Sequence, residues 1–392
     1  MITATLLALG TGTAGATVLV YNNWSGNLDS KDLSSQLKDR PENEEVAGPQ
    51  EPLDILVMGS DTREGAGNNI DGLVGDGERS DTTILLHLSA DRQDAYGISI
   101  PRDTLVDRPT CYEEDGVTEI PGAENAMWNE AFSLGGPACT IQQFEQLTDI
   151  RVDNYLVIDF QGFRDMVNAL GGVEVCIPEE IDDDKANIHL EAGTRELKGD
   201  EALGYVRVRN VGDGTDPNRI RRQQAFMAAM INKAVSAGML TRLDRLVGFV
   251  NAVTDSITTD YEDPQDLVSL GRSFQGVGLD NVRFVTTPWQ YSTIDPNRVE
   301  WLPEVGKLWR LVRKDRPLTE QFTDESISAA ERPDGSEPPR GEASDPSGTD
   351  DPNGTDDPSA TDGTDGTDGS DTGTDDTDDG LSDEARERAG LC

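Results

Sequence analysis

The residues best suited to chemistry are arginines and aspartates that recur in a few short stretches. The stretches are 59–63 (GSDTR) with 79–82 (RSDT), 99–104 (SIPRDT), 205–209 (YVRVR) and 216–224 (DPNRIRRQQ). Arginines bind phosphate through paired hydrogen bonds and stabilise charge that builds up on it. Because the chain has a net charge of −42, this local concentration of arginine indicates an anion site. The candidate ligands of the anion are Arg63, Arg79, Arg102, Arg207, Arg209, Arg219, Arg222 and Gln223.

Two aspartates in the same stretches could hold a metal ion. Asp61 follows one strand-like run and Asp81 opens the next, so both can lie at one end of neighbouring strands. Mg²⁺ is usually held by one or two carboxylates together with substrate phosphates and water. We therefore consider Asp61 and Asp81 as Mg²⁺ ligands, although two turn-forming aspartates are the simpler interpretation from composition alone.

The stretch 204–209 is predicted to be a strand. Alternate residues of a strand point the same way, so Arg207 and Arg209 would share one face. Two arginines on one face of an apolar strand need an anion or acidic partners. A pair of surface salt bridges is the alternative.

The stretch from 216 is predicted to begin a helix. Asp216 is a good N-cap, and Pro217 suits the first helical position. Arg219, Arg222 and Gln223 would then lie on one face of the first turns. Basic residues oppose the helix dipole there, so their presence favours a face that receives phosphate.

The apolar runs between these motifs predict an α/β fold, a mixed sheet in α-β-α layers. The expected strands are 53–60, 82–89, 95–100, 155–160, 172–177, 204–209 and 282–287, and the expected helices are 140–148, 161–170, 217–237, 241–256, 263–274 and 297–313. We expect four regions, which are a transmembrane anchor (1–21), a linker (22–52), one domain (53–317) and a disordered acidic tail (318–392).

The amino-acid composition supports the assignments of the N-terminal anchor and the C-terminal tail, and it argues against a nucleic-acid partner. Residues 2–20 carry no charge, and a span of about 20 apolar residues crosses a bilayer. We favour an uncleaved anchor over a cleaved signal peptide. The tail is rich in Thr, Asp and Gly and cannot bury enough surface to offset its chain entropy. No nucleic-acid partner is expected, because nucleic-acid binding depends on neutralising phosphates with basic residues, whereas this chain has a net charge of −42.

In order and spacing, the motifs resemble the LytR-CpsA-Psr family of cell-wall ligases, of the actinobacterial type. The resemblance covers about residues 53–235 and includes LVMGSDTR, RSDTTILLHL, SIPRDTLV, LKGDEALGYVRVR and DPNRIRRQQAFMAAMI. It implies an α-β-α domain outside the cell membrane, with a hydrophobic tunnel for a polyprenyl chain. Phe163, Met166 and Phe226 are candidate tunnel residues, although an ordinary core is the favoured interpretation for any single one of them.

The resemblance also implies an activity and assigns roles to residues. The activity is Mg²⁺-assisted transfer of a glycan phosphate from a polyprenyl-pyrophosphate-linked glycan to a sugar hydroxyl on peptidoglycan. Asp61 and Asp81 would hold Mg²⁺, while Arg102, Arg207 and Arg219 would be catalytic. Asp216 would orient an arginine or assist proton transfer. A pyrophosphatase that uses water, or a non-catalytic regulator that binds lipid phosphates, is an alternative.

The four cysteines fit an exported protein. An oxidising environment would let Cys111 and Cys139 form a disulfide, a pattern also found in the actinobacterial members that the chain resembles. Two free thiols in an intracellular protein are the alternative. Cys176 lies in an apolar run and is predicted to be a small buried residue. Cys392 is not assigned a role.

Overall fold

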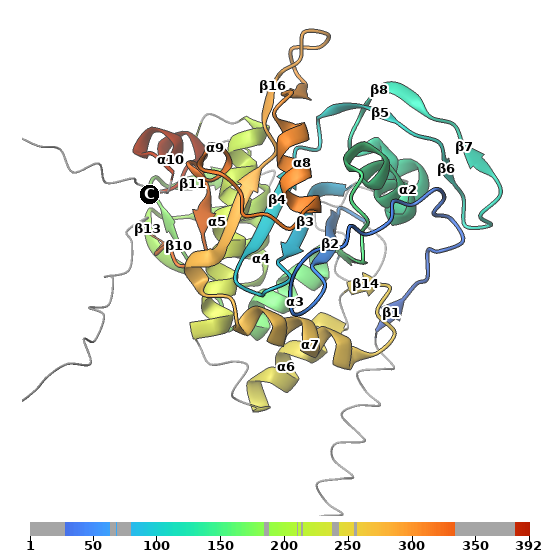
Figure 1. Cartoon of the computed structure of the whole chain (residues 1–392). Coiled ribbons are helices and arrows are strands. Elements are labelled where there is room, and N and C mark those ends of the chain that lie inside the picture. Colours follow the sequence, from blue (N-terminus) through green and yellow to red (C-terminus); the bar gives the residue numbers. More distant parts are fainter. Residues whose placement is uncertain are drawn as a thin grey trace, which may run out of the picture.

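The computed structural model describes residues 28–62, 68, 80–183, 188–209, 211–212, 215–236, 243–254, 257–333 and 381–392. Its centre is an eight-stranded mixed sheet with the order β1-β14-β9-β2-β3-β4-β15-β18 (Figure 1). These strands are Asp29–Ser30 (β1), Leu53–Ser60 (β2), Ser80–Leu88 (β3), Ala95–Ile100 (β4), Asn154–Ile158 (β9), Ile257–Thr259 (β14), Val282–Thr286 (β15) and Ile327–Ser328 (β18).

Helices and two-stranded hairpins surround the sheet. The helices are Glu130–Thr148 (α2), Phe160–Ala169 (α3), Gly199–Arg207 (α4), Asp216–Ser236 (α5), Leu243–Thr254 (α6), Pro264–Gln275 (α7), Val305–Arg313 (α8), Glu320–Thr323 (α9) and Asp383–Ala389 (α10), with one 3₁₀ turn at Leu279–Asn281 (η1). The paired strands are Leu105–Arg108 (β5) with Ala123–Met127 (β8), Cys111–Tyr112 (β6) with Glu119–Ile120 (β7), Val173–Ile177 (β10) with Gly193–Leu197 (β13), Ile181–Asp183 (β11) with Ile188–Leu190 (β12), and Trp289–Tyr291 (β16) with Val299–Trp301 (β17).

Strand β4 shows why the fold has three layers. All six of its residues are buried, because successive side chains point to opposite faces and both faces are covered. Tyr96, Ile98 and Ile100 join a core cluster with residues of α2 and α8. On the opposite face, Ser99 accepts a hydrogen bond from Gln224 of α5 at 2.8 Å. The predicted mixed α/β fold is confirmed.

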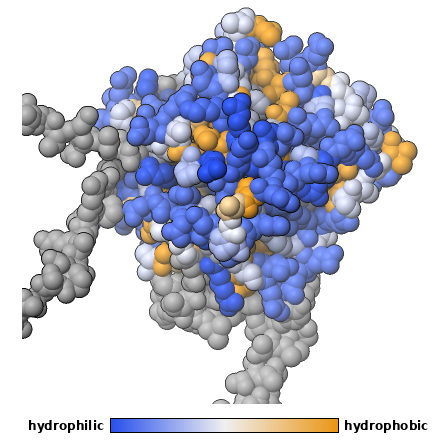
Figure 2. Space-filling model, viewed as in Figure 1, coloured by the Kyte–Doolittle hydropathy of each residue, from blue (hydrophilic) through white to orange (hydrophobic). Residues whose placement is uncertain are grey.

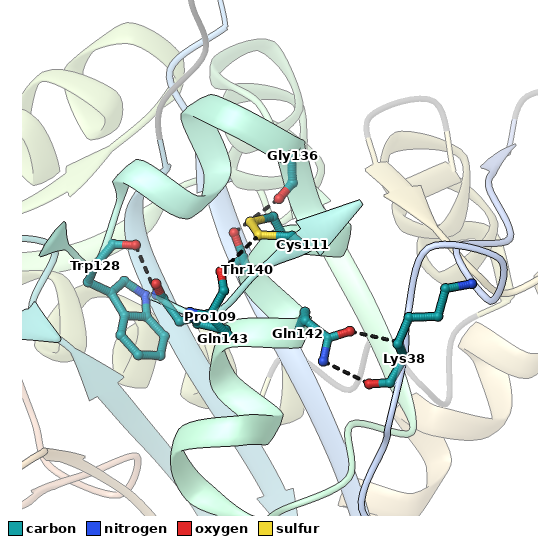
Figure 3. Close-up of a disulfide and its surroundings, with 9 residues drawn as sticks. Lys38, Pro109, Cys111, Trp128, Gly136, Thr140, Gln142 and Gln143 are labelled. Carbon is teal, nitrogen blue, oxygen red and sulfur yellow. Dashed lines mark hydrogen bonds between the residues drawn. A yellow bond between two sulfur atoms is a disulfide. The ribbon is translucent and has the colours of Figure 1, made fainter. Parts of the chain in front are cut away.

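The predicted linker and tail both contain folded parts. Residues 28–52 are predicted as linker, yet β1 pairs with β14. The Gln142 amide on α2 also exchanges two hydrogen bonds with the backbone of Lys38, at 2.7 and 2.8 Å (Figure 3). The prediction of disorder for 318–392 is wrong at both described ends. Strand β18 joins the central sheet, and α10 packs into an apolar cluster with β15 and α5.

Two disulfides connect these elements. Cys111 and Cys139 form the predicted bond, which links β6 to α2 and is shown in Figure 3. Cys176 is bonded to Cys392, so it is not the free buried thiol that its apolar surroundings suggested. This second bond fixes the segment that carries α10 to the hairpin β10–β13.

The predicted anchor, residues 1–21, lies outside the described residues. Among the helices that the structure does describe, none combines the length and apolar character needed to cross a bilayer. The face in Figure 2 is mostly hydrophilic, with hydrophobic residues in small separate groups.

Candidate anion-binding and catalytic site

One end of the central sheet brings the arginine and aspartate motifs together. Ser60, which ends β2, pairs with Ser80, which begins β3, so Asp61 and Asp81 follow at the same edge. Strand β4 ends at Ile100, and Arg102 follows it after Pro101. The first turn of α5 supplies Asp216 and Arg219. Residues distant in sequence thus meet at one site, as the motifs predicted.

Arg102 is at the centre of this site and joins two aspartates from different elements. Its Nη1 donates to Asp81 Oδ1 at 2.7 Å, and its Nη2 lies 3.1 Å from Asp216 Oδ1. The same Asp216 oxygen accepts a hydrogen bond from Arg219 Nη2 at 2.7 Å. Asp216 therefore orients two arginines, which is the first of the two roles considered for it. We call Asp81, Arg102, Asp216 and Arg219 the Arg–Asp cluster.

The cluster is well buried and retains unused hydrogen-bonding capacity. The side chains of Arg102 and Arg219 are only 13% and 5% exposed. Within the described part of the chain, Arg102 Nε, Arg219 Nε and Asp216 Oδ2 are buried without a hydrogen-bond partner. Leaving buried charged groups unsatisfied is costly. A ligand with several acceptor oxygens, such as a diphosphate, would satisfy the two arginine donors.

The pKa values show how strongly the cluster charges interact. Burial alone would raise the pKa of Asp81, but Arg102, Arg219 and Arg209 together lower it. Burial would lower the pKa of Arg102, yet the charges of Asp216 and Asp81 raise it. For Arg219 burial dominates and lowers the pKa despite Asp216. Asp81 is therefore an anion at neutral pH, available to Arg102 or to a cation.

Arg207 ends helix α4, and Arg209, two residues further on, is close enough to the Arg–Asp cluster to act on its charges. The prediction of a strand at 204–209 is wrong, because α4 runs to Arg207. Arg209 follows it as an exposed residue and is close enough to Asp81 and Arg219 to change their pKa values. The Arg207 guanidinium lies 4.6 Å from the centre of the Phe160 ring, where a cation is attracted to the aromatic face.

Arg222 and Gln223 do not join the Arg–Asp cluster. The Arg222 guanidinium is buried and donates to the backbone carbonyls of Tyr205, Val208 and Ala389. Its predicted role as an anion ligand is therefore not supported by the geometry. Gln223 accepts from Thr82 Oγ1 at 3.3 Å and donates to Val206 O at 3.1 Å, which ties α4 and α5 to the sheet.

The donor set suits Mg²⁺ only with the help of a substrate. Across the described residues, no group of three or more His, Cys, Asp or Glu side chains is placed to hold a metal. Asp61 and Asp81 lie at the same end of the paired strands β2 and β3, which fits an ion that takes one or two carboxylates plus phosphate oxygens. Arg63 and Arg79, the other predicted ligands in this region, lie outside the described residues.

The sequence prediction missed Asp103 and Arg298. Arg298 Nη1 donates to Asp103 Oδ1 at 3.3 Å, and Arg102 Nε lies 3.7 Å from Asp103 Oδ2. Burial raises the pKa of Asp103, with Arg102 opposing it. A signal was present, because the tetrapeptide Asp-Pro-Asn-Arg occurs at both 216–219 and 295–298.

A cavity of about 730 Å³ opens at the same end of the sheet. Ser60 and Thr62, on either side of Asp61, line it together with Asp159, which follows β9. The predicted tunnel residues lie elsewhere. Val167, Phe226 and their neighbours pack into a core cluster against β10 and α4, with Phe163 against it.

The fold and the Arg–Asp cluster together define a class of α/β proteins with buried arginines and aspartates paired at one end of the central sheet. The chain matches the LytR_cpsA_psr family over residues 20–307, and it belongs to that family. The predicted family is thereby confirmed.

Individual relatives agree with this assignment. The chain is 34% identical to the probable cell wall biosynthesis protein LcpB of Corynebacterium glutamicum, over 53% of this chain and 48% of LcpB. It is 30% identical to the Bacillus subtilis polyisoprenyl-teichoic acid–peptidoglycan teichoic acid transferase TagV, over 55% of this chain and 52% of TagV. The chain thus spans about half the length of these relatives.

A solved structure of a LytR-Csp2A-Psr enzyme from Actinomyces oris has a similar fold. The TM-score is 0.51 at 21% identity, and the match covers 70% of this chain and 96% of the other.

Proposed function

We propose that this protein is a phosphotransferase that moves a glycopolymer from a polyprenyl-pyrophosphate carrier to peptidoglycan. The observation that carries the proposal is Arg102, which joins Asp81 to Asp216 while Arg219 lies on the same Asp216 oxygen. A strongly acidic protein has concentrated buried arginines at one sheet end, and phosphoryl transfer depends on such electrostatic stabilisation. Family membership and the names of the relatives support the same reaction.

The step is a displacement at phosphorus. A hydroxyl oxygen of a peptidoglycan sugar attacks the phosphorus that bears the glycan. The bond from that phosphorus to the bridging oxygen breaks, and polyprenyl phosphate leaves with the bonding electron pair. The hydroxyl proton passes to solvent or to a nearby carboxylate. Arg102 and Arg219 stabilise the phosphate oxygens, and Arg207 and Arg209 approach the diphosphate from the end of α4.

Mg²⁺ would be held by Asp61 and Asp81. When bound, it neutralises charge on the diphosphate and on the leaving phosphate. Asp81 also accepts a hydrogen bond from Arg102 at 2.7 Å, so the same carboxylate would connect the metal site to the arginines.

We propose that the reaction takes place on the outer side of the cell membrane. Two disulfides support an oxidising compartment. The uncharged residues 2–20 would form a single-pass anchor that keeps the enzyme close to its lipid-linked donor.

The test is a transfer assay with purified full-length protein, a lipid-linked glycan and peptidoglycan. The expected result is glycan covalently attached to peptidoglycan, with loss of attachment in Arg219→Ala. The matched control is Arg195→Ala, which changes an exposed arginine of β13 that is paired only with Glu191 among the described contacts. Glycan released to water at the same rate with and without acceptor would instead show a pyrophosphatase. Donor binding without release or transfer would show a non-catalytic regulator.

A further inference from the structure

Arg222 holds the end of α4 although it takes no part in the Arg–Asp cluster. Its Nε donates to Tyr205 O at 3.3 Å, and its Nη2 donates to Val208 O. These carbonyls belong to the last turn of α4 and the residue after it. Carbonyls at a helix end have no partner within the helix, and a cation there also complements the helix dipole. Arg222 thus fixes the backbone on both sides of Arg207 and just before Arg209.

The third contact of Arg222 reaches a distant part of the chain. Its Nη1 donates to Ala389 O, at the end of α10, at 3.2 Å. The arginine is only 1% exposed, so losing this acceptor would leave a buried charged donor unsatisfied. One side chain therefore joins the end of α4 to the end of α10.

The two segments also pack closely at two glycines. A Cβ atom added to Gly212 would lie 2.0 Å from the backbone oxygen of Arg388, and one added to Gly390 would lie 2.2 Å from the side-chain Cγ1 of Val211. Both glycines have positive φ angles, which other residues adopt only at a cost. Val211 and Gly212 are therefore packed directly against the end of α10.

The segment 381–392 is itself firmly attached. Leu381, Ala385, Ala389 and Leu391 are buried in a cluster with Phe284. Arg386 pairs with Glu331 at 3.2 Å in a largely buried contact, and Cys392 is bonded to Cys176. The region predicted to be a disordered tail thus ends in a folded segment that is packed against the domain.

We propose that residues 381–392 position Arg207 and Arg209 for the diphosphate, and that Arg222 is the positioning residue that transmits this support. This inference depends on the proposed function in one respect only, which is that the anion is a diphosphate. Residues 205–208 are held on one side by Gln223, through Val206 O, and on the other by Arg222, while residues 211–212 pack against α10. Without α10, the segment 205–212 would lose its packing partner and its backbone would move.

The test inserts a protease recognition sequence between residues 350 and 360 of the full-length protein. Four samples are compared. The protein is either cut or uncut, and each of these forms is studied in the oxidised and in the reduced state. In the uncut samples the chain retains 381–392, and in the cut oxidised sample the bond from Cys176 to Cys392 retains it. Only the cut and reduced sample can release the segment, so reduction of Cys111–Cys139 is controlled for. Size-exclusion chromatography verifies release.

Two readouts are measured on all samples, together with the melting temperature. Hydrogen–deuterium exchange of amides 205–212 should become faster only in the cut and reduced sample. The Kd for inorganic pyrophosphate, from calorimetry, should rise at least tenfold there. Reoxidation with a synthetic 381–392 peptide should restore both values. A general loss of stability would instead speed exchange throughout the domain.

A second variant covers the case in which the cut segment stays bound. Ala385→Asp places a carboxylate at a fully buried position of the cluster and should give the same two changes, while Glu384→Gln on the exposed side of α10 should give neither. Unchanged exchange, or faster exchange with unchanged pyrophosphate affinity, overturns the proposal. If the intact protein does not bind pyrophosphate, the proposed function fails, and exchange alone decides whether α10 supports the segment.

Discussion

Arg102 uses two guanidinium nitrogens for two carboxylates, and this geometry determines what can replace it. Arg102→Ala removes both contacts and should lower the rate of glycan transfer by about 10²- to 10³-fold, as loss of a donor to developing charge does elsewhere. Arg102→Lys should recover little, because a lysine is a point charge and cannot span Asp81 and Asp216. Initial rates at saturating donor check this, with Arg195→Ala expected to remain at the unmodified rate.

A substitution of Asp81 tests the proposal that Mg²⁺ assists the reaction. Asp81→Asn keeps the size of the side chain but removes its charge, so the Mg²⁺ concentration for half-maximal transfer should rise about tenfold or more. Chelation should abolish transfer by the unmodified protein, and added Mg²⁺ should restore it. Full activity in the presence of chelator would contradict a metal-assisted reaction.

His87 gives a pH prediction that is independent of the site. It is fully buried on β3, with Nδ1 2.8 Å from Asp54 Oδ1 and Nε2 3.2 Å from Asp315 Oδ1. Burial alone would lower its pKa, but the two aspartates raise it from 6.5 to about 9. Because the folded pKa is the higher one, protonated His87 stabilises the fold fully below about pH 6.5, and this is lost as the pH rises through 9.

The rise in the His87 pKa from 6.5 to about 9 corresponds to a stabilisation of the fold on the order of 3 kcal/mol. Urea unfolding between pH 6 and 9.5 should show a falling free energy of unfolding in the unmodified protein. His87→Gln should be less stable at pH 6 and show a flatter profile. Equal slopes for the two proteins would contradict a charged His87.

At the scale of elements, the helix α4 shows where pattern reading fails. The alternation in YVRVR suggested a strand, but it covers only a few residues, and short alternating runs do not separate strand from helix. Ala202, Leu203 and Tyr205 are all buried, and α4 packs against α3, α5 and β12. The shared strand face predicted for Arg207 and Arg209 is therefore wrong, because the helix that carries Arg207 depends on tertiary packing, and their role at the anion site stays a prediction.

The disulfide from Cys111 to Cys139 makes a prediction for α2. It closes a stretch with a sequence separation of 28 residues, and replacing both cysteines by alanine should cost about 3 to 4 kcal/mol of folding free energy. A lower melting temperature with an unchanged pyrophosphate Kd is expected, because the bond lies on β6 and α2. A large loss of pyrophosphate affinity would show that α2 contributes to the anion site.

At the scale of the whole molecule, the sequence predicted the layered fold and most of the central strands. Apolar runs such as LDILVMGS are strongly specified by burial on both faces. The ends of the chain were harder to predict. Ala385 and Ala389 are small residues whose burial depends on a cluster formed by distant strands, and the bond between Cys176 and Cys392 could not be derived from spacing. The sequence motifs named Asp81, Arg102, Asp216 and Arg219, which the fold brings together, whereas the repeat of Asp-Pro-Asn-Arg that pointed to Arg298 was not used.

The proposed anchor is also tested on the whole molecule. Full-length protein should remain with the membrane fraction after a carbonate wash, because residues 2–20 are long enough to cross a bilayer. A variant that begins at residue 28 should be released while it keeps its melting temperature. Release of the full-length protein by carbonate would contradict a membrane-spanning anchor.

The central claim is that the glycan-bearing phosphate moves intact to peptidoglycan, and isotope tracing tests it most directly. The donor carries ³²P only in the phosphate next to the glycan, and the products are separated into peptidoglycan, lipid and soluble fractions. The label is expected in peptidoglycan, joined to the glycan, with unlabelled polyprenyl phosphate in the lipid fraction. Label that appears only in soluble glycan phosphate, or stays on the lipid, would contradict the transfer.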